Sequence, residues 1–319
     1  MKTLNKILYL LLILFAFSCE DIIEKDISND TIQIISPVIG TVVSSNVTTF
    51  QWNSLKGANN YRVQVFNSSQ AIVLDSLVKN KVSLTATLIQ GQYQWKVRGE
   101  NFAYQSNYSL PVSFSVVPST DLTAQQVILT NPTNNYYTNS TSVTLGWQNL
   151  SAATSYNLEL VNITNGSSVV YQQANILTNS VTLSGVNLAQ DAEYQWKIKA
   201  LNTTAQTPFA IRTLFIDRVV PNLPQNSLPA NNSIQLANQA LTFNWSSSTG
   251  AGTIQSPITY TIEFSNSATF ASLIQTSNSV TNTFQQTFTT SGDYYWRIKA
   301  IDAAGNNSGY SSPFKFTIN

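Results

Sequence analysis

Apolar and polar residues alternate in short runs along most of the chain. Three runs end in a tryptophan, at Trp52, Trp147 and Trp245. Three more have the form Tyr-x-Trp and continue with a base and a β-branched residue: Tyr93-Gln-Trp95, Tyr194-Gln-Trp196 and Tyr294-Tyr-Trp296. A period of two turns one face of a strand toward a core and the other toward solvent. Because no segment beyond the N-terminal apolar run has a helical period, the pattern predicts an all-β protein.

Both tryptophan contexts recur at nearly constant intervals. The first recurs after 95 and 98 residues and the second after 101 and 100. An immunoglobulin-like sandwich needs about 100 residues, so the sequence predicts three copies of one domain, at 32–118, 127–217 and 221–319. The two connections contain Pro118, Pro221 and Pro224. Proline restricts the backbone, which predicts limited interdomain angles and a semi-rigid rod.

The third copy carries an insertion. Tyr61 and Tyr156 lie nine residues after the first tryptophan of their copies, whereas Tyr260 lies fifteen after. The six extra residues fall within 246–257, a stretch rich in Ser, Thr and Gly that predicts a longer loop. The copies otherwise share a turn proline near the start and a phenylalanine in the closing strand: Pro37 with Phe114, Pro132 with Phe215, and Pro229 with Phe316.

These landmarks resemble bacterial fibronectin type III-like domains. The shared features are a Trp late in strand B, a Tyr opening strand C, and Tyr-x-Trp-x-Val/Ile-x-Ala on strand F. The first copy departs from the pattern at Gly99, where the others have Ala200 and Ala300. The resemblance covers about residues 32–319 and implies three tandem antiparallel β-sandwiches. It says little about activity, because such domains serve as spacers, adhesins and sugar-binding accessories alike.

The N-terminus has the pattern of a lipoprotein signal peptide. Lys2 and Lys6 precede the apolar run 7–17, whose eleven residues are too few to cross a bilayer core of about 30 Å. The run ends in Ala-Phe-Ser-Cys19, which resembles a lipobox, and Cys19 is the only cysteine. We expect residues 1–18 to be a signal peptide. The resemblance implies that Cys19 is diacylated and holds the mature protein to a membrane.

Five acids and one base follow between residues 19 and 30. Like charges keep such a segment extended, so residues 19–31 are predicted to be a solvated acidic tether. The same acids also resemble the export signal that sends lipoproteins of Bacteroidetes-type bacteria to the cell surface. That resemblance implies an outer-membrane protein with its domains outside the cell. The two interpretations are compatible.

Composition argues against catalysis. Charged residues make up 10% of the chain, the net charge is +1, and there is no histidine. The commonest general base and metal ligand is therefore missing, and a near-neutral chain offers no attraction for nucleic acid. The closest acids in the repeats, Asp191 and Glu193, fall in a predicted loop. We expect no enzyme activity, cofactor or metal site.

The aromatic residues fall into two groups. All six tryptophans alternate in phase with aliphatic neighbours, which predicts a place in the cores and not a sugar-stacking platform. Phe102, Tyr104 and Tyr108 instead follow strand F of the first copy, and Tyr136 and Tyr137 open the second. Loops at the ends of a sandwich are common binding sites. Phe102, Tyr104 and Tyr108 are therefore candidates for a ligand patch, with local packing or an interdomain contact as the alternative.

Basic residues recur on the outward phase of strand F. In the second and third copies, Glu159 and Glu263 on strand C are predicted to pair with these bases. The first copy has Gln64 at that place and adds Arg62 to Lys96 and Arg98. Three bases with no acid on strand C predict a site for an anionic partner such as an acidic polysaccharide.

Two short motifs, Asp30-Thr31-Ile32 and Asp75-Ser76-Leu77, resemble the O-glycosylation acceptor of Bacteroidetes-type bacteria. This makes Thr31 and Ser76 candidate modification sites. Taken together, the sequence predicts a non-enzymatic surface lipoprotein that acts as a rod for adhesion, display or assembly with envelope proteins. The alternative is a surface glycan-binding accessory of a polysaccharide-uptake system.

Overall fold

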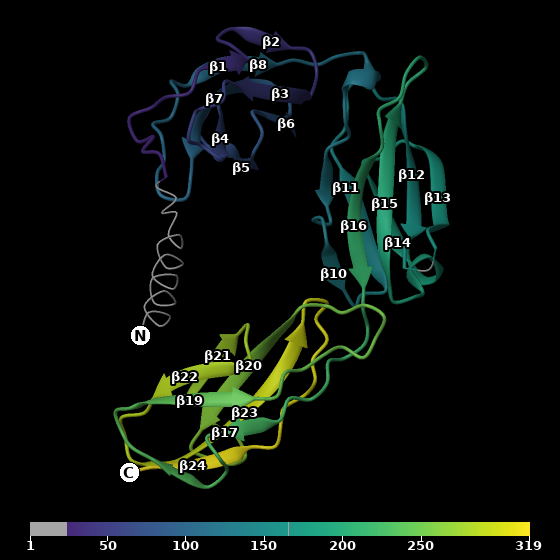
Figure 1. The fold of residues 1–319 in the computed structure, drawn as a ribbon. Coiled ribbons are helices and arrows are strands. Elements are labelled where there is room, and N and C mark those ends of the chain that lie inside the picture. The colour runs from purple at the N-terminus through teal and green to yellow at the C-terminus, as the bar shows by residue number, and fades with distance from the viewer. Residues whose placement is uncertain (1–23, 165) are drawn as a thin grey trace, which may run out of the picture. The chain divides into compact units, whose positions relative to one another are not determined.

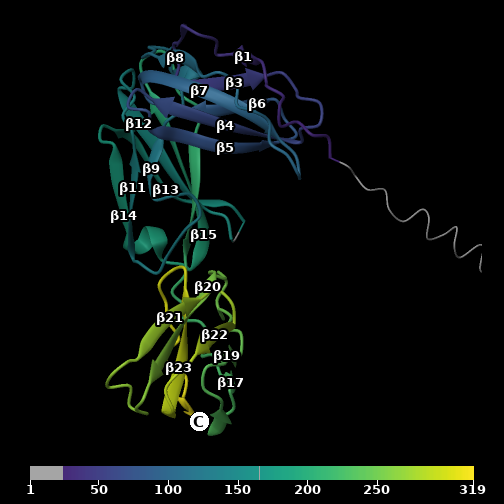
Figure 2. The same cartoon turned by 90° about the vertical axis from the view of Figure 1, so that its left-hand side faces the viewer.

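The computed structural model describes residues 24–164 and 166–319. The chain divides between Thr120 and Asp121 into two compact units. The first unit contains one β-sandwich and the second contains two, as Figures 1 and 2 show. The predicted signal peptide and the predicted lipidation of Cys19 lie outside the described residues.

The first sandwich consists of a three-stranded and a five-stranded sheet. The smaller sheet has the order β1 (Ile34–Ser36), β3 (Val47–Trp52), β6 (Ser83–Thr87). The larger has the order β2 (Thr41–Val43), β8 (Val112–Val116), β7 (Gly91–Glu100), β4 (Asn60–Asn67), β5 (Ile72–Lys79). In the letters of type III domains, β4 is strand C, β7 is strand F and β8 is strand G.

The second and third sandwiches repeat this order. In the second, the sheets are β9 (Leu129–Asn131), β11 (Ser142–Trp147), β14 (Ser180–Ser184), and β10 (Tyr136–Thr138), β16 (Ala210–Ile216), β15 (Ala192–Leu201), β12 (Ser155–Asn162), β13 (Ser168–Ile176). In the third, they are β17 (Asn226–Leu228), β19 (Ala240–Trp245), β22 (Thr283–Thr287), and β18 (Ser233–Gln235), β24 (Phe314–Ile318), β23 (Gly292–Asp302), β20 (Ile258–Ser265), β21 (Gln275–Ser279). Two short 3-10 helices, η1 (Leu122–Ala124) and η2 (Gly185–Leu188), belong to the second unit.

The predicted turn prolines mark the point where the chain changes sheets. Pro37 lies between β1 and β2, which belong to opposite sheets, and Pro132 and Pro229 lie at the matching places. After the turn, the short second strand pairs in parallel with the last strand of its copy. The other strand pairs are antiparallel, so the predicted antiparallel sandwich is confirmed with this one parallel pair added to each copy.

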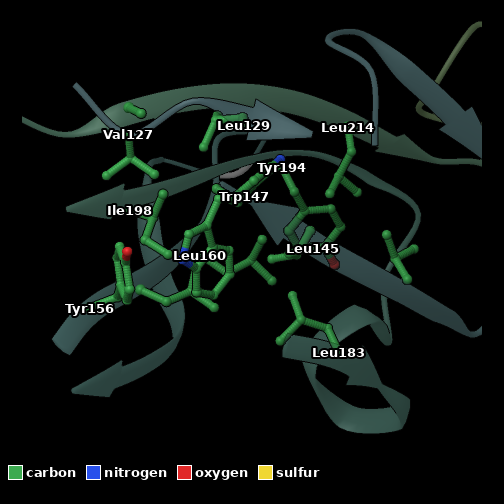
Figure 3. Close-up of a cluster of buried hydrophobic side chains, with 14 of the residues drawn as sticks. Val127, Leu129, Leu145, Trp147, Tyr156, Leu160, Leu183, Tyr194, Ile198 and Leu214 are labelled. Atoms are coloured by element: carbon green, nitrogen blue, oxygen red, sulfur yellow. The ribbon is translucent and has the colours of Figure 1, made fainter. Parts of the chain in front are cut away.

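All six tryptophans lie in the cores, as the alternation predicted. Their side chains are between 0% and 2% exposed. In each copy the first tryptophan packs against the tyrosine that opens strand C, with ring centroids 5.5, 5.5 and 5.4 Å apart. Figure 3 shows this arrangement around Trp147 and Tyr156 in the second sandwich. Replacing such a buried ring by alanine removes about 3–5 kcal/mol of stability.

The core tyrosines keep their hydroxyl groups paired at the sandwich ends. Tyr61, Tyr156 and Tyr260 accept a backbone N–H from the preceding loop at 3.1, 2.9 and 2.8 Å. The tyrosines that open the Tyr-x-Trp motifs donate to a carbonyl four residues earlier, at 2.7, 3.0 and 2.9 Å. Each tyrosine therefore packs its ring in the core and fastens a loop with its hydroxyl.

Residues 24–31 differ from the solvated tether that their charges predicted. Ile27 is fully buried, and the Lys25 carbonyl accepts Asn101 Nδ2–H at 2.9 Å. A Cβ on Gly57 would lie 2.9 Å from the Lys25 Cβ and 3.2 Å from Ile27 Cγ2, so this segment lies directly on the loop before β4. The buried Ile27 side chain and the hydrogen bonds of Lys25 together place this segment on the first sandwich.

Candidate functional site

The basic residues nominated in the first copy gather on the outer face of its larger sheet. Arg62 on β4 lies directly opposite Arg98 on β7. Glu100, at the end of β7, lies beside both guanidinium groups: its Oε1 lies 2.8 Å from Arg98 Nη2 and 3.6 Å from Arg62 Nε. Arg62 Nη1 also lies 3.1 Å from Asp75 Oδ1 on β5. The structure thus brings the candidates together and pairs them with acids.

These ion pairs correct the expectation of unbalanced positive charge. No acid lies on β4, but Asp75 on the neighbouring strand and Glu100 on β7 itself balance the two arginines. A hydrogen bond from Gln64, together with the contact with Arg62, holds the pKa of Asp75 below its usual value against the opposing effect of burial. Lys96 is left as the only excess charge of this group. Electrostatic attraction for an anionic ligand is correspondingly weak.

Tyr108, the third aromatic candidate, is covered by two cations. Lys96 Nζ lies 4.3 Å and Arg98 Cζ lies 4.8 Å from its ring centroid. Burial raises the pKa of the Tyr108 hydroxyl above its usual value. A sugar stacks on an open ring face, and here the cations occupy that face. Tyr108 is therefore part of the sheet surface and does not form a stacking platform as it stands.

This cation–aromatic contact recurs in all three copies. Lys199 lies over Phe209 at 5.0 Å, and Arg297 lies over Tyr310 at 3.9 Å. Tyr108, Phe209 and Tyr310 follow the second tryptophan of their copies by 13, 13 and 14 residues. Of these three aromatic residues, only Tyr108 was predicted from the sequence to belong to a site. The recurring spacing is the signal that identifies the contact as a repeated structural feature.

In the third copy an acid joins the contact. Arg297 Nη2 lies 2.7 Å from Glu263 Oε2, which confirms the predicted cross-strand ion pair. The Tyr310 hydroxyl donates to Glu263 Oε1 at 2.5 Å. Burial and, after it, this carboxylate raise the pKa of Tyr310 to about 12. In the second copy, Glu159 lies opposite Lys197 in the strand register.

Phe102 and Tyr104 are the two nominated aromatics that remain open. They belong to the first-copy turn, residues 101–105, which follows β7. Asn101 Oδ1 accepts the N–H groups of Ala103 and Tyr104 at 3.1 and 2.7 Å, which fixes the turn. The Phe102 side chain is 96% exposed and that of Tyr104 is 37% exposed. The candidate patch is thus split into a sheet face whose two arginines are paired with acids and an exposed aromatic tip.

The inserted loop of the third copy lies against the segment that follows the second sandwich. Ser256 donates its hydroxyl to Asp217 Oδ2 at 2.5 Å, and the Asp217 side chain is only 2% exposed. A Cβ on Gly252 would lie 2.8 Å from Val219 Cγ2, so the loop and the connection are in close contact. The longer loop was predicted, but its role in holding the connection was not.

The third-copy turn, residues 302–306, completes this contact. Asn306 Nδ2 donates to the Asp217 carbonyl and to Asp302 Oδ2, both at 2.9 Å. Asn139 of the second sandwich donates to Asn306 Oδ1 at 3.0 Å, and its N–H bonds the Ala304 carbonyl at 3.1 Å. We call the set Asn139, Asp217, Ser256, Asp302 and Asn306 the joint. Asp217, Ser256, Asp302 and Asn306 are buried, whereas Asn139 is exposed. Because the four buried residues pair their polar groups with one another, each depends on the others.

The remaining nominated sites differ in access. Thr31 is exposed, whereas Ser76 is half-buried on the edge strand β5. Tyr136 is 40% exposed and borders a shallow hollow with Pro132 and Val143, whereas Tyr137 stacks on Phe215 at 4.4 Å. Within residues 24–164 and 166–319, no cluster of three or more acidic or thiol side chains is placed to hold a metal ion. In the same residues, no helix has the length and apolarity to span a bilayer.

Comparison with known proteins finds distant structural likenesses only. No family model matches the chain, and no curated protein matches it. Among solved structures, it resembles the FN1–FN3 domains of chicken CNTN1, with 14% identity over 90% of this chain and 97% of that one and a TM-score of 0.44. The strand order within the two sheets of each copy is that of a fibronectin type III-like fold. The fibronectin(III)-like modules of CbhA from Clostridium thermocellum give 13% identity, 60% and 93% coverage, and a TM-score of 0.37.

Proposed function

We propose that this chain is a non-enzymatic, lipid-anchored surface protein that holds type III-like modules in a fixed order for display or for assembly with other envelope proteins. The observation that carries this proposal is the joint. Buried polar groups that pair between two sandwiches are a feature of modules held together, because each unpaired group would cost about 1–3 kcal/mol. A chain that only linked independent binding domains would have no need of such a contact.

The use of the acidic side chains supports a non-catalytic role. Glu100 and Glu263 balance arginines on the sheet faces, and Asp217 and Asp302 are hydrogen-bonded within the joint. A glycosidase places two carboxylates on either side of a bond in a cleft. These four carboxylates are instead committed to holding strands and loops together.

The anchor is tested on the protein purified from membranes of its host. Mass spectrometry of the N-terminal peptide is expected to find a chain that begins at Cys19 and carries a diacylglyceryl group. Cys19→Ser is expected to leave the leader uncleaved and unacylated. Protease added to intact cells should digest the wild-type sandwiches if they lie on the outer face. A wild-type chain that keeps its leader, with an unmodified thiol, would overturn the anchor.

Glycan binding remains the alternative function, supported by the two open aromatics. With the face of Tyr108 covered, a sugar would have to use Phe102 and Tyr104. Affinity electrophoresis in gels that contain polysaccharide tests this. The control is Tyr171→Ala, which removes a half-buried tyrosine of the second copy. Retardation that is lost in Tyr104→Ala and kept in the control would favour glycan binding. Unretarded migration in every polysaccharide would remove it.

A further inference from the structure

The first-copy turn lies beside the point where the described chain begins. Asn101 Nδ2 donates to the Lys25 carbonyl at 2.9 Å and to the Gly57 carbonyl at 2.8 Å. Lys25 Nζ reaches the Lys56 carbonyl at 3.1 Å. The N-terminal segment, the loop before β4 and the first-copy turn are therefore fastened to one another. We call this end of the first sandwich the N-terminal end.

The predicted lipid would be close to this end. Five residues lie between Cys19 and Lys25, so six residue-to-residue steps connect them. A fully extended chain covers at most about 3.6 Å per residue, so the lipidated cysteine lies within about 22 Å of the turn. The ten residues of β7 span about 33 Å. An anchored chain thus keeps its N-terminal end within reach of the bilayer surface, while the opposite end, at the turn before β7, lies about one strand length farther from the anchor along the sandwich.

Of the three turns that follow strand F, only the first-copy turn carries aromatic residues. Seven residues after the second tryptophan, the copies have Phe102, Thr203 and Ala303. Nine residues after it, they have Tyr104, Ala205 and Gly305. A phenylalanine that is 96% exposed packs against nothing in its own sandwich. The copy nearest the anchor therefore carries an apolar tip where the other two carry small residues.

We propose that Phe102 inserts into the interfacial zone of the membrane that carries the anchor, with Tyr104 at the level of the headgroups. The proposal rests on acylation of Cys19. Aromatic side chains favour the boundary between headgroups and acyl chains. A single side chain binds a membrane weakly, but the anchor makes the contact intramolecular and the local concentration high. The turn would then set the orientation of the first sandwich, and the lipid would supply the attachment.

The charges of this end favour a neutral bilayer surface over an anionic one. Lys25 Nζ is paired with Asp30 Oδ2 at 3.2 Å, and Asp26 is exposed nearby. Lys56 is exposed, so bases and acids are mixed at this surface. The contact should therefore form on zwitterionic phosphatidylcholine and persist at high salt, because apolar insertion is not screened.

Photo-crosslinking in the full-length acylated protein tests the insertion. The photoreactive analogue p-azidophenylalanine replaces Phe102 in one sample and Ile89 in the matched control. Ile89 is 54% exposed and lies in the turn before β7, at the opposite end of the same sandwich. In phosphatidylcholine vesicles, we expect a lipid adduct at position 102 at least about tenfold more abundant than at position 89. Equal yields at the two positions would overturn the proposal.

A second sample separates this proposal from the anchor. A chain that begins at Cys19 is coupled through its thiol to a maleimide-headgroup lipid, which supplies a membrane attachment whatever the host does. Lipid adducts at position 102 in this coupled sample, together with an unmodified Cys19 in the host protein, would refute the native anchor and keep the docking surface. An acylated Cys19 without lipid adducts at position 102 would refute the docking surface and keep the anchor. Adducts to a second chain or to added polysaccharide in place of lipid would also refute it.

Discussion

The turn after strand F is built differently at the two ends of this protein. In the third copy, residues 302–306 form part of the joint, and Asp302 and Asn306 are each 7% exposed. In the first copy, the matching residues 101–105 carry Phe102, which is 96% exposed. Both turns begin with a side chain that accepts backbone N–H groups, Asp302 in one and Asn101 in the other. The scaffold therefore fixes the turn in both copies, and the residues at its tip decide what it contacts.

The largest expected effect concerns the segment that covers the N-terminal end. Ile27 is fully buried, so Ile27→Ala should weaken the attachment of residues 24–31 by about 3 kcal/mol. Hydrogen exchange of the backbone amides in this segment should then be about a hundredfold faster, while exchange in β7 is unchanged. Ile39→Ala, at a side chain that is 79% exposed, is the control. Unchanged exchange in the Ile27 variant would mean that other contacts hold the segment.

The next effect concerns the joint. Asn306→Ala removes two bonds donated to the buried Asp217 and Asp302 and one bond accepted from Asn139, which should destabilise the third sandwich by about 2 kcal/mol. The measurement is urea unfolding followed by hydrogen exchange of third-copy peptides. Gln105→Ala, in the exposed part of the first-copy turn, should cost less than about 0.5 kcal/mol. Similar costs for the two changes would remove the contrast between the turns.

Tyr310, the aromatic residue that follows the third-copy turn, gives a pH-dependent test. The pKa of Tyr310 is raised to about 12, so the fold favours the neutral phenol. Its contribution to stability is complete below the ordinary value of 10 and is lost as the pH rises from 10 through about 12. Ultraviolet titration of tyrosinate should lose its latest component in Tyr310→Phe, and that component should move to lower pH in Glu263→Gln. An unchanged titration in both variants would contradict this environment.

The smallest effect is expected at the open tip. Phe102→Ser should change the free energy of unfolding by less than about 0.5 kcal/mol, because the side chain has no packing to lose. Calorimetry of the unacylated chain, without vesicles, is the appropriate measurement. A clear fall in the melting temperature of the first sandwich would show that Phe102 is packed in solution and is unavailable to a membrane.

Local pattern was enough to predict the cores. The two-residue period placed Trp95 and its neighbours inward, and the proline landmarks marked the change of sheet. Gly99, which departed from the repeat, lies where a Cβ would come within 2.9 Å of both the Ala58 Cβ and Leu55 Cδ2. Gly99 therefore allows a close contact with the loop before β4, within the same fold as the other two copies. Such contacts depend on residues that are distant in the sequence, so the repeat alone could not reveal them.

The polar interactions were predicted less well for the same reason. The acid that balances Arg98 is Glu100 on the same strand, two residues away, whereas the prediction considered only strand C. Asp217, Ser256 and Asn306 each look like ordinary loop residues, and only the fold shows that they meet. The acids of residues 19–31 predicted a solvated tether, whereas Ile27 is buried on the first sandwich. Charge and composition describe a segment's solubility, but not the surface that it covers.

A double-mutant cycle on Asp217 and Ser256 tests most directly whether the second and third sandwiches are fastened to each other. The two residues lie on opposite sides of the connection and share a buried 2.5 Å hydrogen bond. The free energies of unfolding of Asp217→Ala, Ser256→Ala and the double variant are compared with that of the wild type. We predict a coupling energy above about 1 kcal/mol, because either single change leaves a buried partner unpaired. Changes that add to within about 0.3 kcal/mol would show that the two residues act independently and would contradict the joint.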